Sequence, residues 1–380
     1  MKESKTVAMK TESGIVLVTG SSGTIGHAVM HRFAGRFESL VGFDREAPKP
    51  APPNCTHISV DITSDESVRE GLRVLREHHG AHIASVIHLA AYYDFSGAPS
   101  EKYDEVTVQG TGRLLRGLRE TGFQVDQFVF SSTMLVHQPA EPGQFINEDW
   151  PIGPTWAYPK SKVRTEKMIH DERGPIPAVL LRIAGVYDDG CHSIPLAHQM
   201  KRFYEGEMTK SIYSGSTAHG QSFVHLDDLL DAIALVVERR AKLPAEVPIL
   251  LGEPEPLTYD ELQHTFARLL LGKEMETLEV PHALAPLAKA GAWVMDKLPS
   301  VDSFIKPWMI DRASDHYALD ITRARTLLGW EPKRSLRDTI PKMVEALKAD
   351  PAKFYEENKL GEPPAPVEEK QQDAAVSAPT

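Results

Sequence analysis

The stretch TWAYPKSKVRTEK holds a tyrosine and a lysine, Tyr158 and Lys162, whose spacing suits acid–base chemistry. Side chains four residues apart lie on one face of a helix. A free phenol has a pKa of about 10 and is a poor base at neutral pH, but a nearby ammonium group stabilises the phenolate and lowers that pKa. Pro159 is tolerated only in a first helical turn, so we expect Tyr158 at the start of a helix. The pair predicts a tyrosine that exchanges a proton with a substrate.

Three hydroxyl groups follow the strand-like run FVF upstream of this pair, on Ser131, Ser132 and Thr133. At the end of a strand, one of them can hydrogen-bond a substrate oxygen while a hydride leaves or reaches the neighbouring carbon. At least one of the three is expected only to terminate the strand.

A glycine motif near the N-terminus, VLVTGSSGTIGHAVMHRF, combines Thr19 with Gly20, Gly23 and Gly26. An apolar strand precedes it and an amphipathic helix follows, which is the context that a dinucleotide motif requires. Gly20 and Gly23 permit a tight turn and close backbone approach, and Gly26 lets the helix pack against the strand. The helix N-terminus offers unpaired N–H groups to a pyrophosphate.

An aspartate, Asp44, ends the next strand-like run, LVGFD. A carboxylate there can hold both ribose hydroxyls and repels a 2′-phosphate, so NAD is favoured over NADP. Arg45 keeps the alternative open, because a guanidinium can accept that phosphate. After a third strand-like run, HISV, Asp61 and Ile62 stand where they can contact the adenine.

The elements that must position these residues alternate between apolar strands and helices from Ile15 to Tyr187. Continuous apolar strands separated by helices predict a parallel sheet covered on both faces, and right-handed crossovers then give a doubly wound α/β fold of Rossmann type. The stretch EKYDEVTVQGTGRLLRGLRETG predicts one long helix, and AVLLRIAGVY predicts one strand. Thr258 and Glu261 form a capping-box pattern, and His225 stands where a helix N-cap is expected.

The residue pattern changes after Tyr187, where proline, glycine and single aromatic residues become frequent and the alternation of strands and helices becomes less regular. We predict a smaller C-terminal substrate lobe beside the NAD-binding Rossmann domain. The expected ranges are a disordered 1–13, the Rossmann domain 14–187 with 220–240 returning to it, the substrate lobe 188–219 and 241–350, and a disordered tail 361–380. The segment Ala283 to Ile310, rich in large apolar residues, is expected to cover the substrate as a lid.

Composition narrows the function classes. The net charge of −11 argues against a surface for nucleic acid or for anionic membranes. No apolar run is long enough for membrane insertion, and the polar N-terminus lacks the pattern of a signal peptide. Cys55 and Cys191 are far apart and read as free thiols of a reducing compartment, so a cytoplasmic location is expected. No His or Cys spacing predicts a metal site.

Together these motifs resemble the extended short-chain dehydrogenase/reductase superfamily, in its branch of NAD-dependent epimerases and dehydratases. TGxxGxxG, the strand-end aspartate, HLAA (His88 to Ala91), SST, YxxxK, LRIAGVY, SFVHLDDL and LLGWEP occur in the family's order over residues 14 to 345. The resemblance implies that Tyr158 is the acid/base, that Lys162 lowers its pKa and binds the nicotinamide ribose, and that Thr133 takes the serine/threonine role. It also implies a small-molecule substrate and a homodimer. The expected cofactor-binding positions are Gly20, Ser22, Gly23, Thr24, Ile25, Gly26, Asp44, Asp61, Ile62, Leu89, Ala90, Ala91, Ser131, Tyr158, Lys162 and Ile183.

The substrate half departs from the family pattern. Met134 and Leu135 follow Thr133 where sugar dehydratases carry an acidic pair, which argues against elimination chemistry. Nucleotide-sugar epimerases usually have asparagine at the position of Gly185 and arginine at that of Gln221. Thr107 replaces a customary asparagine, and His137-Gln138 replaces a customary Tyr-Gly pair. The expected substrate-contacting residues are Tyr92, Thr133, Gly185 and Gln221.

The sequence therefore predicts an NAD-dependent oxidoreductase of epimerase or dehydrogenase type that transfers hydride at a hydroxyl-bearing carbon. A sugar or nucleotide-sugar substrate follows from the family resemblance. Two alternatives stay open: a reductase or dehydrogenase of a non-sugar alcohol or ketone, and a non-catalytic NAD(P)-binding regulator. An intact set of Thr133, Tyr158 and Lys162 argues against the regulator, which has no need of all three.

Overall fold

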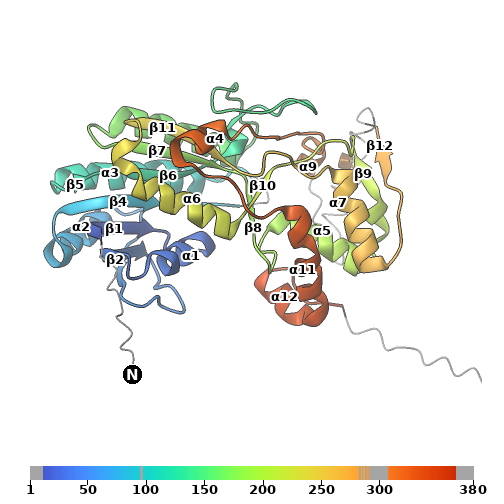
Figure 1. The fold of residues 1–380 in the computed structure, drawn as a ribbon, viewed down its shortest axis with the longest axis horizontal. Coiled ribbons are helices and arrows are strands. Elements are labelled where there is room, and N and C mark those ends of the chain that lie inside the picture. Colours follow the sequence, from blue (N-terminus) through green and yellow to red (C-terminus); the bar gives the residue numbers. More distant parts are fainter. Residues whose placement is uncertain are drawn as a thin grey trace, which may run out of the picture.

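A parallel β-sheet forms the centre of the larger lobe, and a smaller lobe of helices and short strands adjoins it (Figure 1). The computed structural model describes residues 12–94, 97–281, 284, 286, 289–290 and 307–364. Most of the predicted N-terminal segment 1–13, most of the predicted lid 283–310 and most of the predicted tail 361–380 lie outside the described residues.

The main sheet contains eight strands in the order β11-β7-β6-β4-β1-β2-β3, with β5 beside β4. Every pairing in it is parallel. Its strands are β1 (Glu12–Thr19), β2 (Phe37–Asp44), β3 (Thr56–Ser59), β4 (His82–His88), β5 (Gln124–Val125), β6 (Phe128–Thr133), β7 (Ala178–Ile183) and β11 (Glu246–Leu251). The order reverses between β1 and β4, and ligands of such sheets bind at the carboxyl ends of the strands on either side of this switch point.

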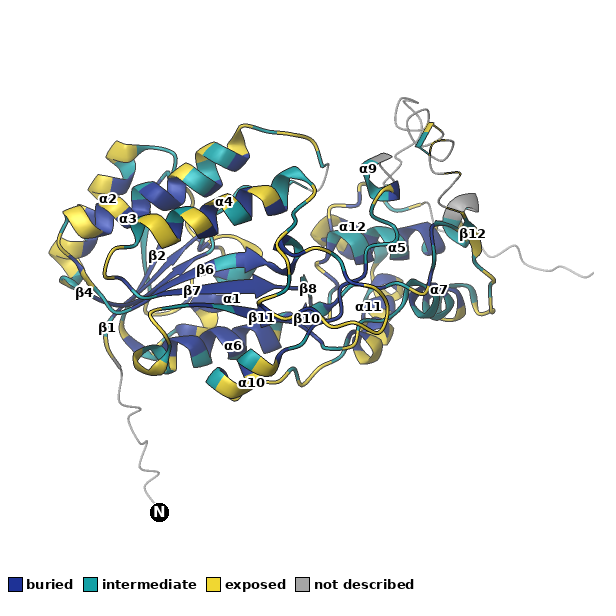
Figure 2. Ribbon diagram, turned by 90° about the horizontal axis from the view of Figure 1, so that it is seen from above, coloured by how far each residue is buried: buried dark blue, intermediate teal, exposed yellow. Residues whose placement is uncertain are grey.

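Helices cover both faces of the sheet, which explains why its strands are apolar throughout (Figure 2). In β1, Val16 and Val18 pack into one core, and Ile15 and Leu17 pack into the core on the opposite face. One face carries α2 (Asp65–His79), α3 (Gly110–Glu120) and α4 (Ala157–Glu172); the other carries α1 (Thr24–Phe33), α6 (Leu226–Glu238) and α10 (Thr322–Leu328). The predicted doubly wound α/β architecture is confirmed.

Two strands differ from their predicted arrangement. The apolar run before Tyr187 is two strands, because β8 (Gly185–Tyr187) leaves the main sheet to pair with β10 (Phe223–His225). The strand β11 pairs with β7 in the main sheet, although 241–350 was assigned to the substrate lobe. Its apolar run is buried there, and an apolar run alone does not reveal which partner will cover it. Helix α10 lies in the same predicted range and also packs against β11 and α6 rather than in the smaller lobe. The rest of the division into lobes stays a prediction.

The long helix predicted from EKYDEVTVQG onward begins as a π-helix, η1 (Tyr103–Gln109), before α3. The wider turn buries both Tyr103 and Thr107 against the loop that follows β4. The Tyr103 hydroxyl donates to Asp94 O at 2.9 Å, and Tyr92 N donates to Thr107 Oγ1 at 3.0 Å. Irregular turns of this kind occur often at functional sites.

The smaller lobe has its own apolar core, to which Phe203, Phe266, Met343 and Tyr355 contribute. Its elements are α5 (Ile194–Tyr204), β9 (Ile212–Ser214), α7 (Tyr259–Phe266), the π-helix η5 (Ala267–Leu271), β12 (Leu278–Val280), α9 (Pro307–Ile310), α11 (Leu336–Ala349) and α12 (Pro351–Glu357). The structure also contains short 3-10 helices, which are η2 (Met134–Val136), η3 (Met208–Ser211) and η4 (Arg240–Lys242). The predicted capping box at the start of α7 is confirmed, as is the His225 cap of α6.

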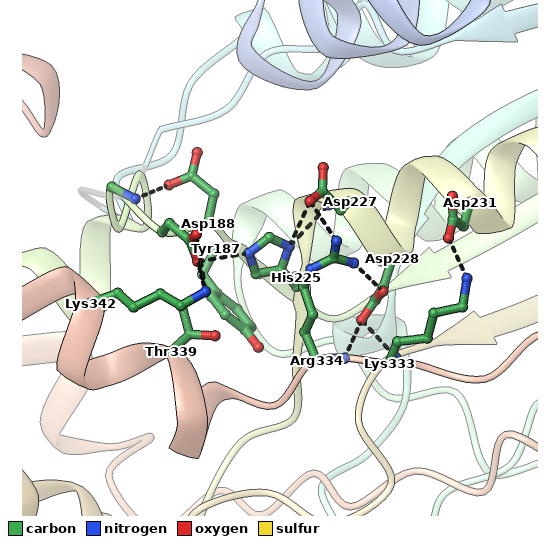
Figure 3. A network of polar contacts seen from close by, with 12 residues as sticks. Tyr187, Asp188, His225, Asp227, Asp228, Asp231, Lys333, Arg334, Thr339 and Lys342 are labelled. Atoms are coloured by element: carbon green, nitrogen blue, oxygen red, sulfur yellow. Dashed lines mark hydrogen bonds and ion pairs between the residues drawn. The ribbon is translucent and has the colours of Figure 1, made fainter.

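A polar network joins the start of α6 to the segment that enters α11 (Figure 3). Buried Asp228 accepts from Lys333 N at 2.9 Å, and from Arg334 N and Arg334 Nη1 at 2.8 and 2.9 Å. Nearby, the Tyr187 hydroxyl donates to Glu253 at 2.8 Å, and burial raises the pKa of Glu253 to about 7. These contacts fix the path of the chain between the two lobes.

Candidate active site

The turn between β1 and α1 fits the phosphates of a dinucleotide. Gly20 has φ +70°, and a Cβ on it would lie 2.8 Å from Ala90 N. A Cβ on Gly26 would lie 2.0 Å from Gly20 O. No side chain caps the first turn of α1, which begins at Thr24 after Gly23. The backbone N–H groups and the positive end of the helix dipole therefore face the turn, as anion binding requires.

Replacement of Gly26 by alanine tests the closeness of this turn. Because the new methyl group collides with a backbone carbonyl, we expect Gly26→Ala to destabilise the fold by about 1–3 kcal/mol and to abolish dinucleotide binding. Gly112→Ala is the matched control in α3, since its methyl meets the flexible end of Arg116 at 3.1 Å and Met168 Sδ at an ordinary contact distance of 3.5 Å. Removing a glycine from a helix interior should stabilise that control by up to about 1 kcal/mol. Chemical denaturation and cofactor titration measure both effects, and equal behaviour of the two variants would contradict the prediction.

Asp44 lies at the end of β2 with its carboxylate turned to the glycine loop. Its Oδ2 accepts from Ser22 N at 3.0 Å and from Ser22 Oγ at 2.7 Å, and its Oδ1 accepts from Arg45 N at 2.7 Å. Asp61, by contrast, accepts from the backbone and hydroxyl of Thr63, and these hydrogen bonds lower the pKa of Asp61. The structure thus brings Asp44 to the glycine turn and uses Asp61 to shape the turn before α2. The adenine contact of Asp61 and Ile62 stays a prediction.

A chain of buried polar side chains holds the segment after β4. The side chains of Thr19, His88 and Thr111 are hydrogen-bonded in this order, with 2.7 Å from Thr19 Oγ1 to His88 Nδ1 and 2.8 Å from His88 Nε2 to Thr111 Oγ1. The chain of hydrogen bonds continues to the backbone carbonyl of Thr107. Thr111 donates its hydroxyl hydrogen to Thr107 O, so it accepts from Nε2–H of His88. Burial lowers the pKa of His88 to about 3, which keeps the ring neutral.

This chain positions the backbone that faces the glycine turn. Leu89 N and Ala90 N donate to Thr19 O and Thr19 Oγ1, each at 3.2 Å. His88 is therefore a buried structural residue. Thr107, which stands where the family pattern has asparagine, is part of the same support.

Tyr158, Lys162 and Thr133 come together at the carboxyl end of β6. Tyr158 is the second residue of α4, and Lys162 lies one turn later with its Nζ 5.7 Å from the centre of the Tyr158 ring. Thr133, the last residue of β6, hydrogen-bonds the Tyr158 hydroxyl. Lys162 Nζ donates to Ser131 O at 2.6 Å. The three residues predicted to act together are thus neighbours.

Burial governs the electrostatics of this group in the protein alone. It raises the pKa of Tyr158 to about 12, and the Thr133 hydrogen bond lowers that pKa in part. Burial also lowers the pKa of Lys162 to about 7. The effect of Lys162 on the pKa of Tyr158 stays a prediction.

The other two hydroxyls of the strand end do not reach Tyr158. Ser131 Oγ donates to His88 O at 3.2 Å. Ser132 hydrogen-bonds Glu166, which forms a buried ion pair with Arg182, with 2.8 Å between Oε2 and Nη2. Arg182 also contacts His137 Nε2 at 3.0 Å. Ser132 therefore belongs to a structural network behind the site.

The predicted substrate residues other than Thr133 make separate contacts. A Cβ on Gly185 would lie 2.6 Å from the Phe223 ring, so the aromatic ring takes the space that a larger residue would need. Gln221 forms an isolated parallel bridge with Tyr317. Tyr92 is half-buried, and its ring meets the edge of Tyr103 with 4.9 Å between ring centres. Contact of these residues with a substrate stays a prediction, and Ile183 simply ends β7.

Sequence reasoning missed an aromatic cluster around Tyr158, which we define as Tyr93, Trp156, Tyr158 and Trp308. The Tyr93 and Trp156 ring centres lie 5.0 and 5.4 Å from that of Tyr158, and Trp308 stacks on Trp156 at 5.0 Å. Trp156 is close to Tyr158 in sequence and offered a signal. Trp308 belongs to the segment Ala283 to Ile310 that was expected to cover the substrate, but its stacking on Trp156 was not predicted.

Two classes of site are not found in the part of the chain that the structure describes. No helix there is both long and apolar enough to cross a bilayer. Nor do three or more His, Cys, Asp or Glu side chains gather there in a way that could hold a metal ion.

Comparison with known proteins adds to this geometry. The model of the NAD dependent epimerase/dehydratase family matches residues 16–252. A 3-beta-hydroxysteroid dehydrogenase of Mycolicibacterium neoaurum is 25% identical over 85% of this chain and 88% of its own length. A UDP-glucose 4-epimerase of Lactobacillus helveticus is 24% identical over 86% of this chain and 94% of its own length. The crystal structure of the Thermus thermophilus UDP-glucose 4-epimerase complexed with NAD superposes with a TM-score of 0.63 at 22% identity, covering 88% of this chain and 99% of that one.

Proposed function

Because this chain belongs to the NAD dependent epimerase/dehydratase family of enzymes, we propose that it transfers hydride between NAD and a hydroxyl-bearing carbon, with Tyr158 as acid/base. The observation that carries the proposal is the hydrogen bond between Tyr158 and Thr133, one helical turn from Lys162. These residues lie at the carboxyl end of β6, which neighbours β4 and thus the switch point of the sheet.

The residues that would hold NAD surround this switch point. Gly20, Gly23 and Gly26 allow the close backbone packing of the turn that would face the pyrophosphate, the first turn of α1 would supply N–H donors, and Asp44 would accept hydrogen bonds from the adenosine ribose. Ser22, Thr24 and Ile25 belong to the same turn. Leu89 to Ala91, Ser131 and Ile183 follow or end neighbouring strands and would line the nicotinamide side, with Lys162 on its ribose. When bound, NAD supplies the acceptor for the hydride.

In the oxidative direction the substrate alcohol loses two hydrogens. The hydroxyl proton would pass to the Tyr158 phenolate, and bound oxidised NAD would accept the hydrogen of the carbinol carbon with both bonding electrons, so that C–O would become C=O. Thr133 orients the substrate oxygen by a hydrogen bond. Since burial raises the pKa of Tyr158 in the protein alone, forming the phenolate requires positive charge brought close by Lys162 and the cofactor. Reduction follows the same steps backwards.

Turnover with NAD separates the two outcomes of this chemistry. Net formation of NADH with release of a ketone indicates a dehydrogenase. Inversion of the alcohol with tightly held NAD and no net NADH indicates an epimerase, in which the hydride returns to the opposite face. The relatives named above include one dehydrogenase and two epimerases, so both outcomes have precedent within the comparison. The proposal concerns hydride transfer itself. It would be contradicted if neither NADH formation nor inversion were observed with every alcohol tested.

Asp44 decides between the two cofactors. We expect Asp44→Asn to weaken NAD binding about tenfold, because charge-assisted hydrogen bonds contribute roughly 1.5–3 kcal/mol, and to shift preference toward NADP. The amide can still accept from Ser22, so the loop should remain folded. Glu46→Gln, an exposed carboxylate two residues later, removes the same charge and should change neither affinity. Calorimetric titration with NAD and NADP tests this, and an unchanged preference in Asp44→Asn would contradict the assignment of Asp44.

A further inference from the structure

The aromatic cluster brings together three segments that are far apart in the sequence. Tyr93 comes from the loop after β4, Trp156 precedes α4, and Trp308 lies in α9. The Tyr93 ring meets Tyr158 edge-on at an interplanar angle of 82°, whereas Trp156 and Trp308 are stacked at 26°. Both geometries are favourable for aromatic pairs. Rings from three separate elements therefore converge on the reacting hydroxyl.

The loop after β4 is fitted closely to this cluster. A Cβ on Gly97, whose φ is +73°, would lie 2.4 Å from Trp308 Nε1, so the indole rests on the loop backbone. The neighbouring Tyr93 nevertheless leaves 49% of its surface exposed. An aromatic ring that is held in place and still exposed beside a catalytic hydroxyl is a ready contact surface for an apolar ligand.

Among the residues that the structure describes, the charged groups near Tyr158 do not form a diphosphate site. Lys162 donates to Ser131 O, and Arg182 is buried against Glu166. The group that borders the Tyr92–Tyr103 contact is an acid, Asp94, whose carboxylate accepts from the Tyr92 hydroxyl at 3.4 Å. Phosphate recognition usually needs converging cations, with arginine preferred for its fork of donors.

Lys102 is a cation on the same side, 5.6 Å from the centre of the Tyr92 ring. It is exposed, and it lies against an aromatic face rather than in a cluster of phosphate donors. A single exposed ammonium does not compensate for the charge of a diphosphate in water. The described surroundings of Tyr158 thus favour an uncharged ligand.

We propose that the aromatic cluster binds the ring system of an apolar fused-ring secondary alcohol, and places its hydroxyl at Tyr158 and Thr133. The proposal rests on the proposed function, since the same Tyr158 removes the hydroxyl proton and NAD accepts the hydride. It adds the substrate class: flat or nearly flat hydrocarbon rings, without phosphate, that can lie against Tyr93 and the Trp156–Trp308 stack. Aromatic contacts of this kind contribute about 0.5–1.5 kcal/mol each beyond the area that they bury.

Binding can be measured separately from turnover. The full chain carrying Tyr158→Phe keeps the ring of the cluster and is titrated with NAD present, with tryptophan fluorescence as the readout of Trp156 and Trp308. The probes are 2-tetralol and dehydroepiandrosterone, both apolar fused-ring secondary alcohols, and UDP-glucose. We expect both alcohols to quench the fluorescence and to bind at least tenfold more tightly than UDP-glucose. Tighter binding of UDP-glucose, or no quenching by either alcohol up to its solubility limit, would overturn the proposal.

Substitution of Tyr93 tests the role of the cluster in catalysis. On the wild-type background, Tyr93→Ala should raise KM for the better alcohol about tenfold and change kcat much less, and Tyr93→Phe should retain most of the affinity that Tyr93→Ala loses. Phe145→Ala is the control, because Phe145 is exposed to a similar extent, 47%, and lines a different concavity with Pro254 and Leu319. Equal effects of Tyr93→Ala and Phe145→Ala would contradict the assignment. Different measurements would show that the proposed function itself is wrong: the protein would not bind NAD, or Tyr158→Phe would turn over the substrate at the full wild-type rate.

Discussion

Tyr158→Phe is expected to lower kcat by about a thousandfold. The substitution removes one oxygen atom and with it the hydroxyl that hydrogen-bonds Thr133 and is proposed to exchange the proton, and positioned acid–base groups contribute about 10²–10⁴ in rate. The phenyl ring keeps its contacts with Tyr93 and Trp156, so the fold and the cofactor affinity should change little. The measurement is the rate of NADH formation with the substrate that the wild type turns over best.

Tyr355→Phe provides the matched control for that experiment. Tyr355 is buried in the smaller lobe, and its hydroxyl donates to Glu205 at 2.9 Å. Loss of this hydrogen bond costs about 0.5–1.5 kcal/mol of stability but should leave kcat unchanged. If Tyr158→Phe kept more than a tenth of the wild-type kcat, Tyr158 would not be the acid/base, and a regulatory role for the fold would gain support.

Glu166→Gln is expected to give the largest loss of stability, about 3–5 kcal/mol. Glu166 and Arg182 are both buried, with 10% and 8% of their side-chain surfaces exposed. The amide has nearly the same shape as the carboxylate, but it leaves the Arg182 guanidinium uncompensated in a medium of low polarity. Because Ser132 also bonds Glu166, the substitution should loosen the end of β6 next to Thr133. Urea denaturation measures the free energy of unfolding.

A second glutamate of the same helix is the control for this loss. Glu172 pairs with Arg116 at 2.9 Å, and both side chains are substantially exposed, by 36% and 44%. Exposed ion pairs contribute about 0–1 kcal/mol, so Glu172→Gln should be nearly neutral. The prediction for Glu166 is wrong if the two variants unfold at the same urea concentration.

The fold could be predicted because its signals are local. Apolar strands, glycine turns and helix caps each depend on a few neighbouring residues, and β1, α1, β2 and α4 occur where the sequence indicated. The position of β11 could not be predicted in the same way, since its apolar run suits any sheet that covers both faces. The π-helix at Tyr103–Gln109 was equally hidden, because it follows from packing against Asp94 and Tyr92 and not from helix propensity.

In the candidate site, too, the features that depend on nearby residues could be predicted, and those that depend on contacts between distant segments could not. Thr133, Tyr158 and Lys162 could be named from their spacing, and the structure brings them together. The pKa of Tyr158 could not be anticipated, since it depends on burial by residues of several segments. The aromatic cluster needs Trp308 to lie beside Trp156, a contact between residues about 150 positions apart that no periodicity reveals.

The contacts of Asp228 have a consequence for the synthesis of the protein. This carboxylate is buried at the start of α6, and its donors are the backbone N–H groups of Lys333 and Arg334, more than 100 residues later. A nascent chain that has emerged only as far as α6 lacks these donors, so the native hydrogen bonds of Asp228 cannot form at that stage. The start of α6 therefore reaches its final packing only after the segment that enters α11 has been made. Folding of the two lobes is completed together, after nearly the whole chain has been made.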